Sequence, residues 1–127
     1  ILKNKLKNHV RLFNWTDNLK NFYLKSKVFI LPSYFEGFGN VLIEALSYSL
    51  PCISVKNDGP KEILNNGKYG LLIKNNKPKT ILNALNKLFK SYKIFAHKAR
   101  LGYKKNIRYD SKKVGHMYLK QINSVLY

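Results

Sequence analysis

One stretch constrains the fold of this chain more than any other: a short apolar run, a proline, a loop with two glycines, and a helical pattern. The apolar run covers residues 28–31, and Pro32 ends it because proline has no N–H to donate to a neighbouring strand. Apolar residues then recur at helical spacing over residues 41–49. In such a strand–loop–helix unit, free N–H groups of the first helical turn point at the ligand, and phosphate is the usual one.

The rest of the chain alternates between strand and helix patterns. The predicted strands cover residues 9–13, 27–31, 52–55 and 70–73. The predicted helices cover residues 16–26 with Thr16 as the N-cap, about 39–49, 58–65, a long helix from Pro78, 91–106, and a last helix from Asp110 or Ser111. This alternation predicts an α/β fold with a Rossmann-like, doubly wound parallel sheet and flanking helices.

At 127 residues the chain is long enough for one domain with a core of its own. We therefore treat residues 1–127 as a single domain. It divides into a motif core, residues 9–73, and a group of C-terminal helices, residues 78–127.

The composition excludes several classes of protein. The hydrophobic fraction of 45% is that of a globular chain, no apolar run approaches the roughly 20 residues of a membrane span, and one cysteine, Cys52, permits no internal disulfide. The net charge of +18 leaves three interpretations open: a nucleic-acid partner, attraction to an anionic membrane, or a lysine-rich composition without a partner. Only three of the 24 basic residues are Arg, the usual specific ligand of bases and phosphates, which argues against nucleic acid.

The glycine loop belongs to a longer motif. Residues 31–46 read LPSYFEGFGNVLIEAL, in which Glu36 and Glu44 are separated by seven residues. This motif resembles the donor-site motif of the retaining glycosyltransferases of family 4, also called group 1, which have the GT-B fold. Further blocks in the same order along the chain are similar to that family: residues 13–18, 51–55, 58–64 and 66–73.

The resemblance implies a nucleotide-diphosphate sugar as the donor, with a UDP-sugar as our first expectation and a GDP-sugar as our second. Glu36 is the expected catalytic carboxylate, which would hold hydroxyls of the transferred sugar and stabilise positive charge near the anomeric carbon. Glu44 would accept hydrogen bonds from the ribose hydroxyls. The sugar and diphosphate would be bound by backbone N–H groups in the loop and first helical turn, at Gly37, Phe38, Gly39, Asn40 and Val41.

The resemblance also implies that no metal or other cofactor takes part, which agrees with a sequence that shows no compact Asp or His cluster. Each motif residue taken alone has a simpler interpretation, an exposed carboxylate or a turn glycine, and the spacing of the set favours the donor site. Phe13 and Trp15 are predicted to be core residues, with a stacked nucleotide base as the alternative. Asp58 and Glu62 are predicted to be helix-capping residues.

Complete GT-B enzymes have two domains with the acceptor domain first, and relatives carry an Arg and a Lys for the diphosphate on strands that have no match here. We therefore expect a partial, C-terminal donor domain that does not transfer sugar alone. Its sheet should have an open edge near residues 9–13, or between them and residues 27–31.

The expected partners are the missing acceptor domain or another chain, a cell-surface or lipid-linked glycan acceptor, and an anionic membrane surface at the cytoplasmic face of the cell membrane. Nucleic acid is not expected. Two other functions stay open: a non-catalytic nucleotide-sugar-binding or partner module from a truncated gene, and a basic nucleic-acid-binding protein, whose affinity would depend steeply on salt.

Overall fold

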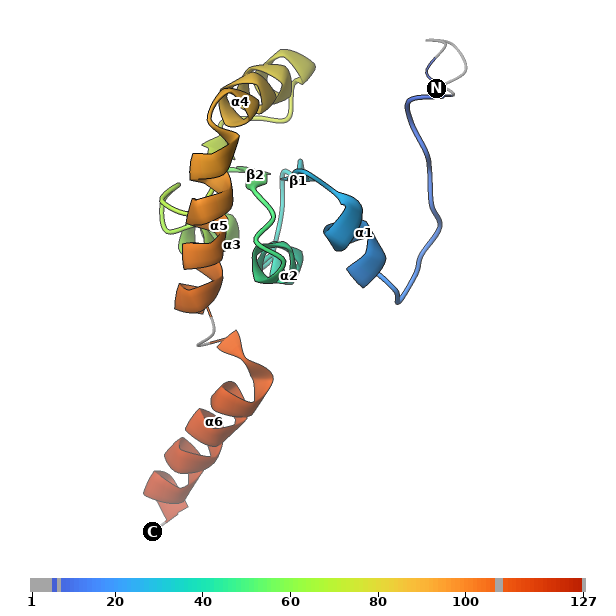
Figure 1. The fold of residues 1–127 in the computed structure, drawn as a ribbon. Helices are drawn as coiled ribbons and strands as arrows, with labels where there is room; N and C mark the ends of the chain where they lie inside the picture. Colours follow the sequence, from blue (N-terminus) through green and yellow to red (C-terminus); the bar gives the residue numbers. More distant parts are fainter. Residues whose placement is uncertain (1–5, 7, 107–108, 127) are drawn as a thin grey trace.

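Three parallel strands form the centre of the molecule. The computed structural model describes residues 6, 8–106 and 109–126 (Figure 1). Its strands are β1 (Phe29–Leu31), β2 (Cys52–Val55) and β3 (Leu71–Ile73), in the spatial order β1-β2-β3. The three strands predicted at 27–31, 52–55 and 70–73 are thus confirmed. The expected open edge is found at β1, since no strand lies on its outer side among the described residues.

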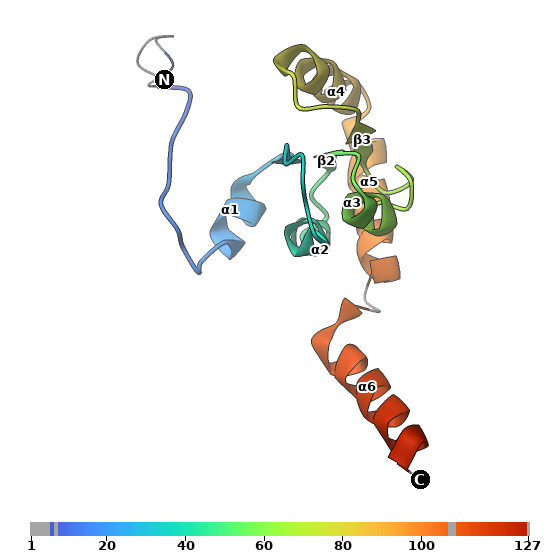
Figure 2. The ribbon, with the colours of Figure 1, turned by 180° about the vertical axis from the view of Figure 1, so that it is seen from behind.

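Helices connect and follow these strands. They are α1 (Lys20–Lys25), α2 (Asn40–Ser47), α3 (Asp58–Ile63), α4 (Pro78–Lys90), α5 (Tyr92–Asn106) and α6 (Ser111–Leu126). Asp110 caps α6, because its Oδ1 accepts hydrogen bonds from the backbone N–H groups of Lys112 and Lys113. α6 extends away from the sheet domain, and its apolar side chains at Met117 and Tyr118 are exposed (Figures 1 and 2).

Helices pack on both faces of the sheet, as a doubly wound arrangement requires. Successive residues of β2 point to opposite faces, and they belong to different apolar clusters. Cys52 packs with the cluster of α2, α3 and Ala99, whereas Ile53 packs with α4 and Phe95. All four residues of β2 are buried, so this central strand is covered from both sides. Figure 1 shows α4 on one side of the strands and α2 and α3 on the other.

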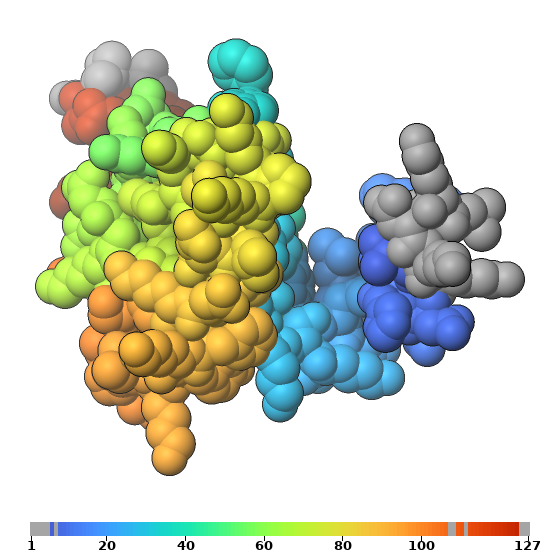
Figure 3. Space-filling model, turned by 90° about the horizontal axis from the view of Figure 1, so that it is seen from above, coloured from blue at the N-terminus to red at the C-terminus, as the bar shows by residue number. Residues whose placement is uncertain are grey.

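The prediction of a strand at residues 9–13 is wrong, because these residues have no strand structure. A strand needs a neighbour to satisfy its backbone N–H and C=O groups, and none of the described residues supplies one. Leu12 remains 82% exposed, and Phe13 packs edge-on against the ring of Phe22 at 4.8 Å between centroids. In the space-filling view this segment stands apart from the sheet domain and joins it through α1 (Figure 3).

The helix that follows begins later than predicted. Leu19 occupies the N-cap position of α1 and makes no side-chain cap. Thr16, the predicted N-cap, instead accepts a hydrogen bond at Oγ1 from the N–H of Asn18 within a turn. The predicted end of the helix near Ser26 is confirmed. Within the described part of the chain, no helix combines the length and the apolar character that crossing a bilayer would need.

Candidate functional site

The glycine loop, residues 32–39, lies beyond the carboxyl end of β1, and the loops after the two other strands hold it in place. The side-chain amide of Asn57 donates to the carbonyl oxygen of Ser33 at 3.0 Å. The amide of Asn76 donates to the carbonyl oxygen of Pro32 at 3.1 Å. Ligands of open parallel sheets bind at this end of the strands, so the loop is fixed at the expected place for a site.

Gly39 turns the chain from the loop into α2. It is the N-cap of the helix, and its φ of +92° lies in the left-handed region that favours glycine. A Cβ atom there would come within 3.4 Å of both the Glu36 and the Leu42 side chains. The carbonyl oxygen of Gly39 accepts a hydrogen bond from the N–H of Leu42 at 2.8 Å. The N–H groups of the first helical turn, at Asn40 and Val41, have no intrahelical acceptor and can receive an anion.

The loop also packs directly against the first turn of α3. A Cβ atom added to Gly59 would lie 2.2 Å from the carbonyl oxygen of Phe38. No side chain fits between these two segments. The ring of Phe38 is meanwhile packed edge-on against Tyr109, at 4.9 Å between centroids. Gly59 is therefore a structural requirement of the glycine loop, although it lies outside the loop.

The helix-capping roles predicted for Asp58 and Glu62 are wrong. Asn57 is the N-cap of α3; it makes no side-chain cap, and its amide nitrogen donates to the glycine loop instead. Asp58 lies in the first turn of α3 and pairs with Lys61 at 2.7 Å, which holds the pKa of the Asp58 carboxyl below its usual range. Glu62 accepts a hydrogen bond from the hydroxyl of Tyr109.

Glu36 lines an open cavity of about 380 Å³ between the glycine loop and the segment after β2, here called the Glu36 cavity. A side chain at Gly37 would meet nothing within 4 Å, so the space beside this glycine is open. Lys56, at the end of β2, brings a positive charge into the same cavity. The other lining residues are Tyr34, Phe35, Asn57 and Asp58. The sequence pattern did not predict Lys56, because only the sheet brings residue 56 next to residue 36.

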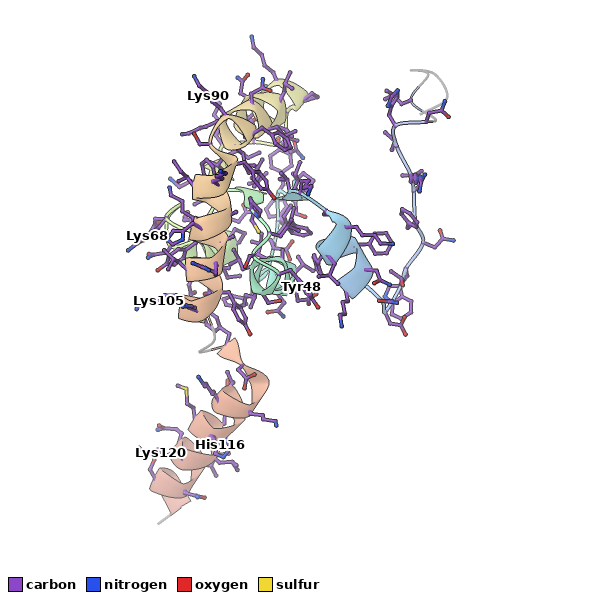
Figure 4. The ribbon with its side chains drawn as sticks, in the orientation of Figure 1. Tyr48, Lys68, Lys90, Lys105, His116 and Lys120 are labelled. Carbon is purple, nitrogen blue, oxygen red and sulfur yellow. The ribbon has the colours of Figure 1, made fainter. Side chains whose placement is uncertain are left out.

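Glu44 lies at a different cavity, of about 440 Å³, between α1 and α2, here called the Glu44 cavity. Its Oε2 accepts a hydrogen bond from the Tyr23 hydroxyl at 3.0 Å. The Tyr23 ring stacks on Tyr48, with centroids 5.4 Å apart and planes at 17°. Figure 4 labels Tyr48 between the two helices. Glu36 and Glu44 therefore line two separate cavities, and the chain between them contains the first turn of α2.

A third, apolar groove of about 590 Å³ adjoins the Glu44 cavity and shares Thr16, Leu19 and Tyr23 with it. Phe13 and Trp15 line this groove and are 63% and 89% exposed, so their predicted place in the core is wrong. Burial of this segment in the core would need a neighbouring strand. The same lack of a neighbour among the described residues explains why residues 9–13 form no strand. The other lining residues are Asn14, Phe22, Ser26, Phe29, Val41 and Leu50.

The remaining candidates for chemistry lie away from these cavities. Cys52 is buried in the sheet, and burial raises the pKa of its thiol, so it is a poor nucleophile. In residues 6, 8–106 and 109–126, no three His, Cys, Asp or Glu side chains come together as a metal site would need.

The fold and the cavities define a class of protein: a Rossmann-like α/β domain with a glycine loop before a helix and two cavities, lined by Glu36 and by Glu44. The sequence model of the glycosyl transferases group 1 family matches residues 1–110, and the chain belongs to this family.

Curated relatives match over short segments. A probable sucrose-phosphate synthase from Thermosipho melanesiensis is 54% identical over 46 residues, which is 36% of this chain and 11% of that protein. A UDP-Gal:alpha-D-GlcNAc-diphosphoundecaprenol alpha-1,3-galactosyltransferase from Escherichia coli is 36% identical over 80 residues, 63% of this chain and 21% of that protein. The chain thus spans about a tenth to a fifth of the length of these relatives.

Solved structures match over nearly the whole chain. Anabaena HepE, crystallised in complex with UDP-glucose, has a TM-score of 0.87 at 19% identity. The match covers 97% of this chain and 34% of the HepE chain. The sucrose-phosphate synthase of Thermosynechococcus elongatus has a TM-score of 0.81 at 22% identity. This match covers 97% of this chain and 33% of the synthase chain. These neighbours are GT-B glycosyltransferases, so the fold class predicted from the sequence is confirmed.

Proposed function

We propose that this chain binds the nucleotide-diphosphate sugar in a retaining glycosyltransferase. The observation that carries the proposal is the position of the α2 N-terminus, which follows the glycine loop and is flanked along the chain by the Glu36 and Glu44 cavities. A donor of this class has three parts in a row: a sugar, a diphosphate and a nucleoside. In chain order, the site has a carboxylate for hydroxyl groups before and after a helix N-terminus that can bind an anion.

Each part of the donor has a proposed ligand. Glu36 accepts hydrogen bonds from hydroxyls of the transferred sugar and stabilises the oxocarbenium charge that develops at its anomeric carbon. The backbone from Gly37 to Val41 binds the sugar and the diphosphate. Glu44 accepts hydrogen bonds from the ribose. Lys56, facing the Glu36 cavity, adds positive charge where the bond to the leaving diphosphate breaks.

The donor that we propose is a UDP-sugar, with a GDP-sugar as the alternative. UDP-glucose is the ligand named for the Anabaena HepE structure, and a UDP-sugar is the donor named for the Escherichia coli relative. That relative also names a diphosphoundecaprenol-linked acceptor, which supports a lipid-linked or cell-surface glycan as the acceptor class here. We place the reaction at the cytoplasmic face of the membrane and propose that it needs no metal.

The cavities described above provide binding groups for the donor only. We therefore propose that residues 1–127 alone bind the donor without transferring its sugar. Transfer needs a second surface that holds the acceptor against the anomeric carbon. A partner domain or another chain would provide it.

Calorimetric titration with UDP, UDP-glucose and GDP-mannose, each with and without EDTA, tests the donor proposal. We expect UDP and UDP-glucose to bind with and without EDTA. An absence of binding to all three ligands would overturn the proposal and favour one of the other functions. A labelled single-stranded DNA added in parallel, at low and high salt, distinguishes a nucleic-acid-binding protein from a protein without a ligand.

A further inference from the structure

Tyr23 is the one buried residue of α1, and its ring is held on two sides. It stacks on Tyr48 of α2 and lies 5.9 Å from the Phe29 ring of β1, between centroids. Its side chain is 7% exposed. The hydroxyl points to α2, where it donates to Oε2 of Glu44. The direction of this hydroxyl is therefore set by packing and not by solvent.

Tyr23 is the donor in this hydrogen bond and Glu44 is the acceptor. Burial, and then the hydrogen bond to Glu44, raise the pKa of Tyr23 above its ordinary value. The phenol therefore keeps its proton and remains a donor throughout the neutral range. The carboxylate of Glu44 can only accept, and one of its oxygens is engaged by this donor. Oε1 receives no hydrogen bond from the described residues and remains available in the Glu44 cavity.

We infer that Tyr23 is a positioning residue for nucleotide binding. It fixes the rotamer of the Glu44 carboxylate so that Oε1 is presented to a ribose hydroxyl before the ligand arrives. The inference rests on the proposed function, in which Glu44 binds the ribose. A freely rotating carboxylate would lose conformational entropy on binding, and a carboxylate that is already oriented loses less.

A simpler role for Tyr23 is to attach α1 to α2. The two roles can be separated because the ring does the packing and the hydroxyl does the orienting. Tyr23→Phe keeps the ring, its stacking on Tyr48 and its burial, and removes only the hydrogen bond to Glu44. Tyr92→Phe is a matched control, because the Tyr92 hydroxyl donates to the carbonyl oxygen of Lys27 at 3.1 Å, and neither residue lines the three cavities described above.

The experiment measures the dissociation constants of UDP and of 2′,3′-dideoxy-UDP, which lacks both ribose hydroxyls. We expect the wild type to bind UDP more tightly than the dideoxy compound. Tyr23→Phe should weaken UDP binding about three- to tenfold, the range for one hydrogen bond, and leave the dideoxy compound unchanged. Tyr92→Phe should change neither constant. In a Glu44→Ala background, Tyr23→Phe should have no further effect on UDP.

Each other result overturns the inference in a distinguishable way. If Tyr23→Phe weakens both nucleotides equally, or neither, Tyr23 does not position Glu44 while the proposed function stands. If the wild type binds the two nucleotides equally, the ribose role of Glu44 is wrong and the inference fails with it. If the wild type binds no UDP, the proposed function itself has failed.

Discussion

The carbonyl oxygen of Phe38 occupies the space in which a side chain at Gly59 would have to begin, 2.2 Å from an ideal Cβ position. The glycine loop and the first turn of α3 are in direct backbone contact at this point. The same turn begins after Asn57, whose amide holds the other end of the loop. The geometry of the glycine loop therefore depends on Gly59, a residue for which we propose no contact with the donor.

Gly59→Ala should displace the glycine loop, because the blocking atoms belong to the backbone and cannot rotate away. We expect the free energy of unfolding to fall by about 1–3 kcal/mol, the cost of overpacking, and UDP binding to weaken with it. Urea denaturation and nucleotide titration measure the two effects. Gly115→Ala on α6 is the control, since a Cβ atom there meets nothing within 4 Å and alanine favours a helix. Equal stability of the Gly59→Ala variant and the wild type would contradict the close contact.

The two loop glycines should respond differently to alanine. Gly39→Ala forces a side chain into the left-handed region, at a cost of about 1–2 kcal/mol in the free energy of unfolding. Gly37→Ala has open space, so its free energy of unfolding should change by less than about 1 kcal/mol. The added methyl at the edge of the Glu36 cavity should nevertheless weaken UDP-glucose binding. Thermal unfolding and titration of both variants provide the check, and a reversed order of stability would rule out the explanation.

Glu36 and Glu44 should have separable effects, because they line different cavities. Glu44→Ala should weaken UDP and UDP-glucose alike by roughly 1.5–3 kcal/mol, the contribution of hydrogen bonds to a charged group. Glu36→Gln should leave UDP binding unchanged and weaken UDP-glucose. Calorimetric titration of each variant with each ligand gives four comparisons. Equal losses for both ligands in both variants would show that the two carboxylates have no distinct roles.

The basic C-terminal helices should attract the chain to anionic membranes. No Asp or Glu occurs between Glu62 and Asp110 in the sequence. Figure 4 labels one lysine on each of these helices: Lys90 on α4, Lys105 on α5 and Lys120 on α6. Each lysine near an anionic surface contributes about 1 kcal/mol, which salt screens.

Co-sedimentation with phosphatidylcholine vesicles, with and without phosphatidylserine, tests this attraction. We expect binding to the anionic vesicles at low salt and release at high salt. Equal binding to both kinds of vesicle would contradict the prediction and would mean that the net positive charge reflects the composition alone.

Local sequence signals predicted most elements of the fold. Pro32 marks the end of β1 and Gly39 marks the turn into α2, as predicted, and of the two predicted caps for α6, Asp110 and Ser111, the structure has Asp110. These signals work because each depends on the backbone of a few adjacent residues. The alternating pattern of residues 9–13 failed as a strand signal because a strand also needs a neighbour, and the pattern contains no information about whether one is present.

The motif predicted which residues to consider as ligands, and the tertiary structure decided how they are arranged. The sequence determined the glycine loop, the helix after it and the separation of Glu36 from Glu44, because these follow from chain order and local conformation. Contacts between distant segments decided the rest: Tyr23 with Glu44, 21 residues apart, Asn76 with Pro32, 44 residues apart, and Phe38 with Gly59. Such pairs depend on the order and register of the three strands, which no short sequence pattern contains.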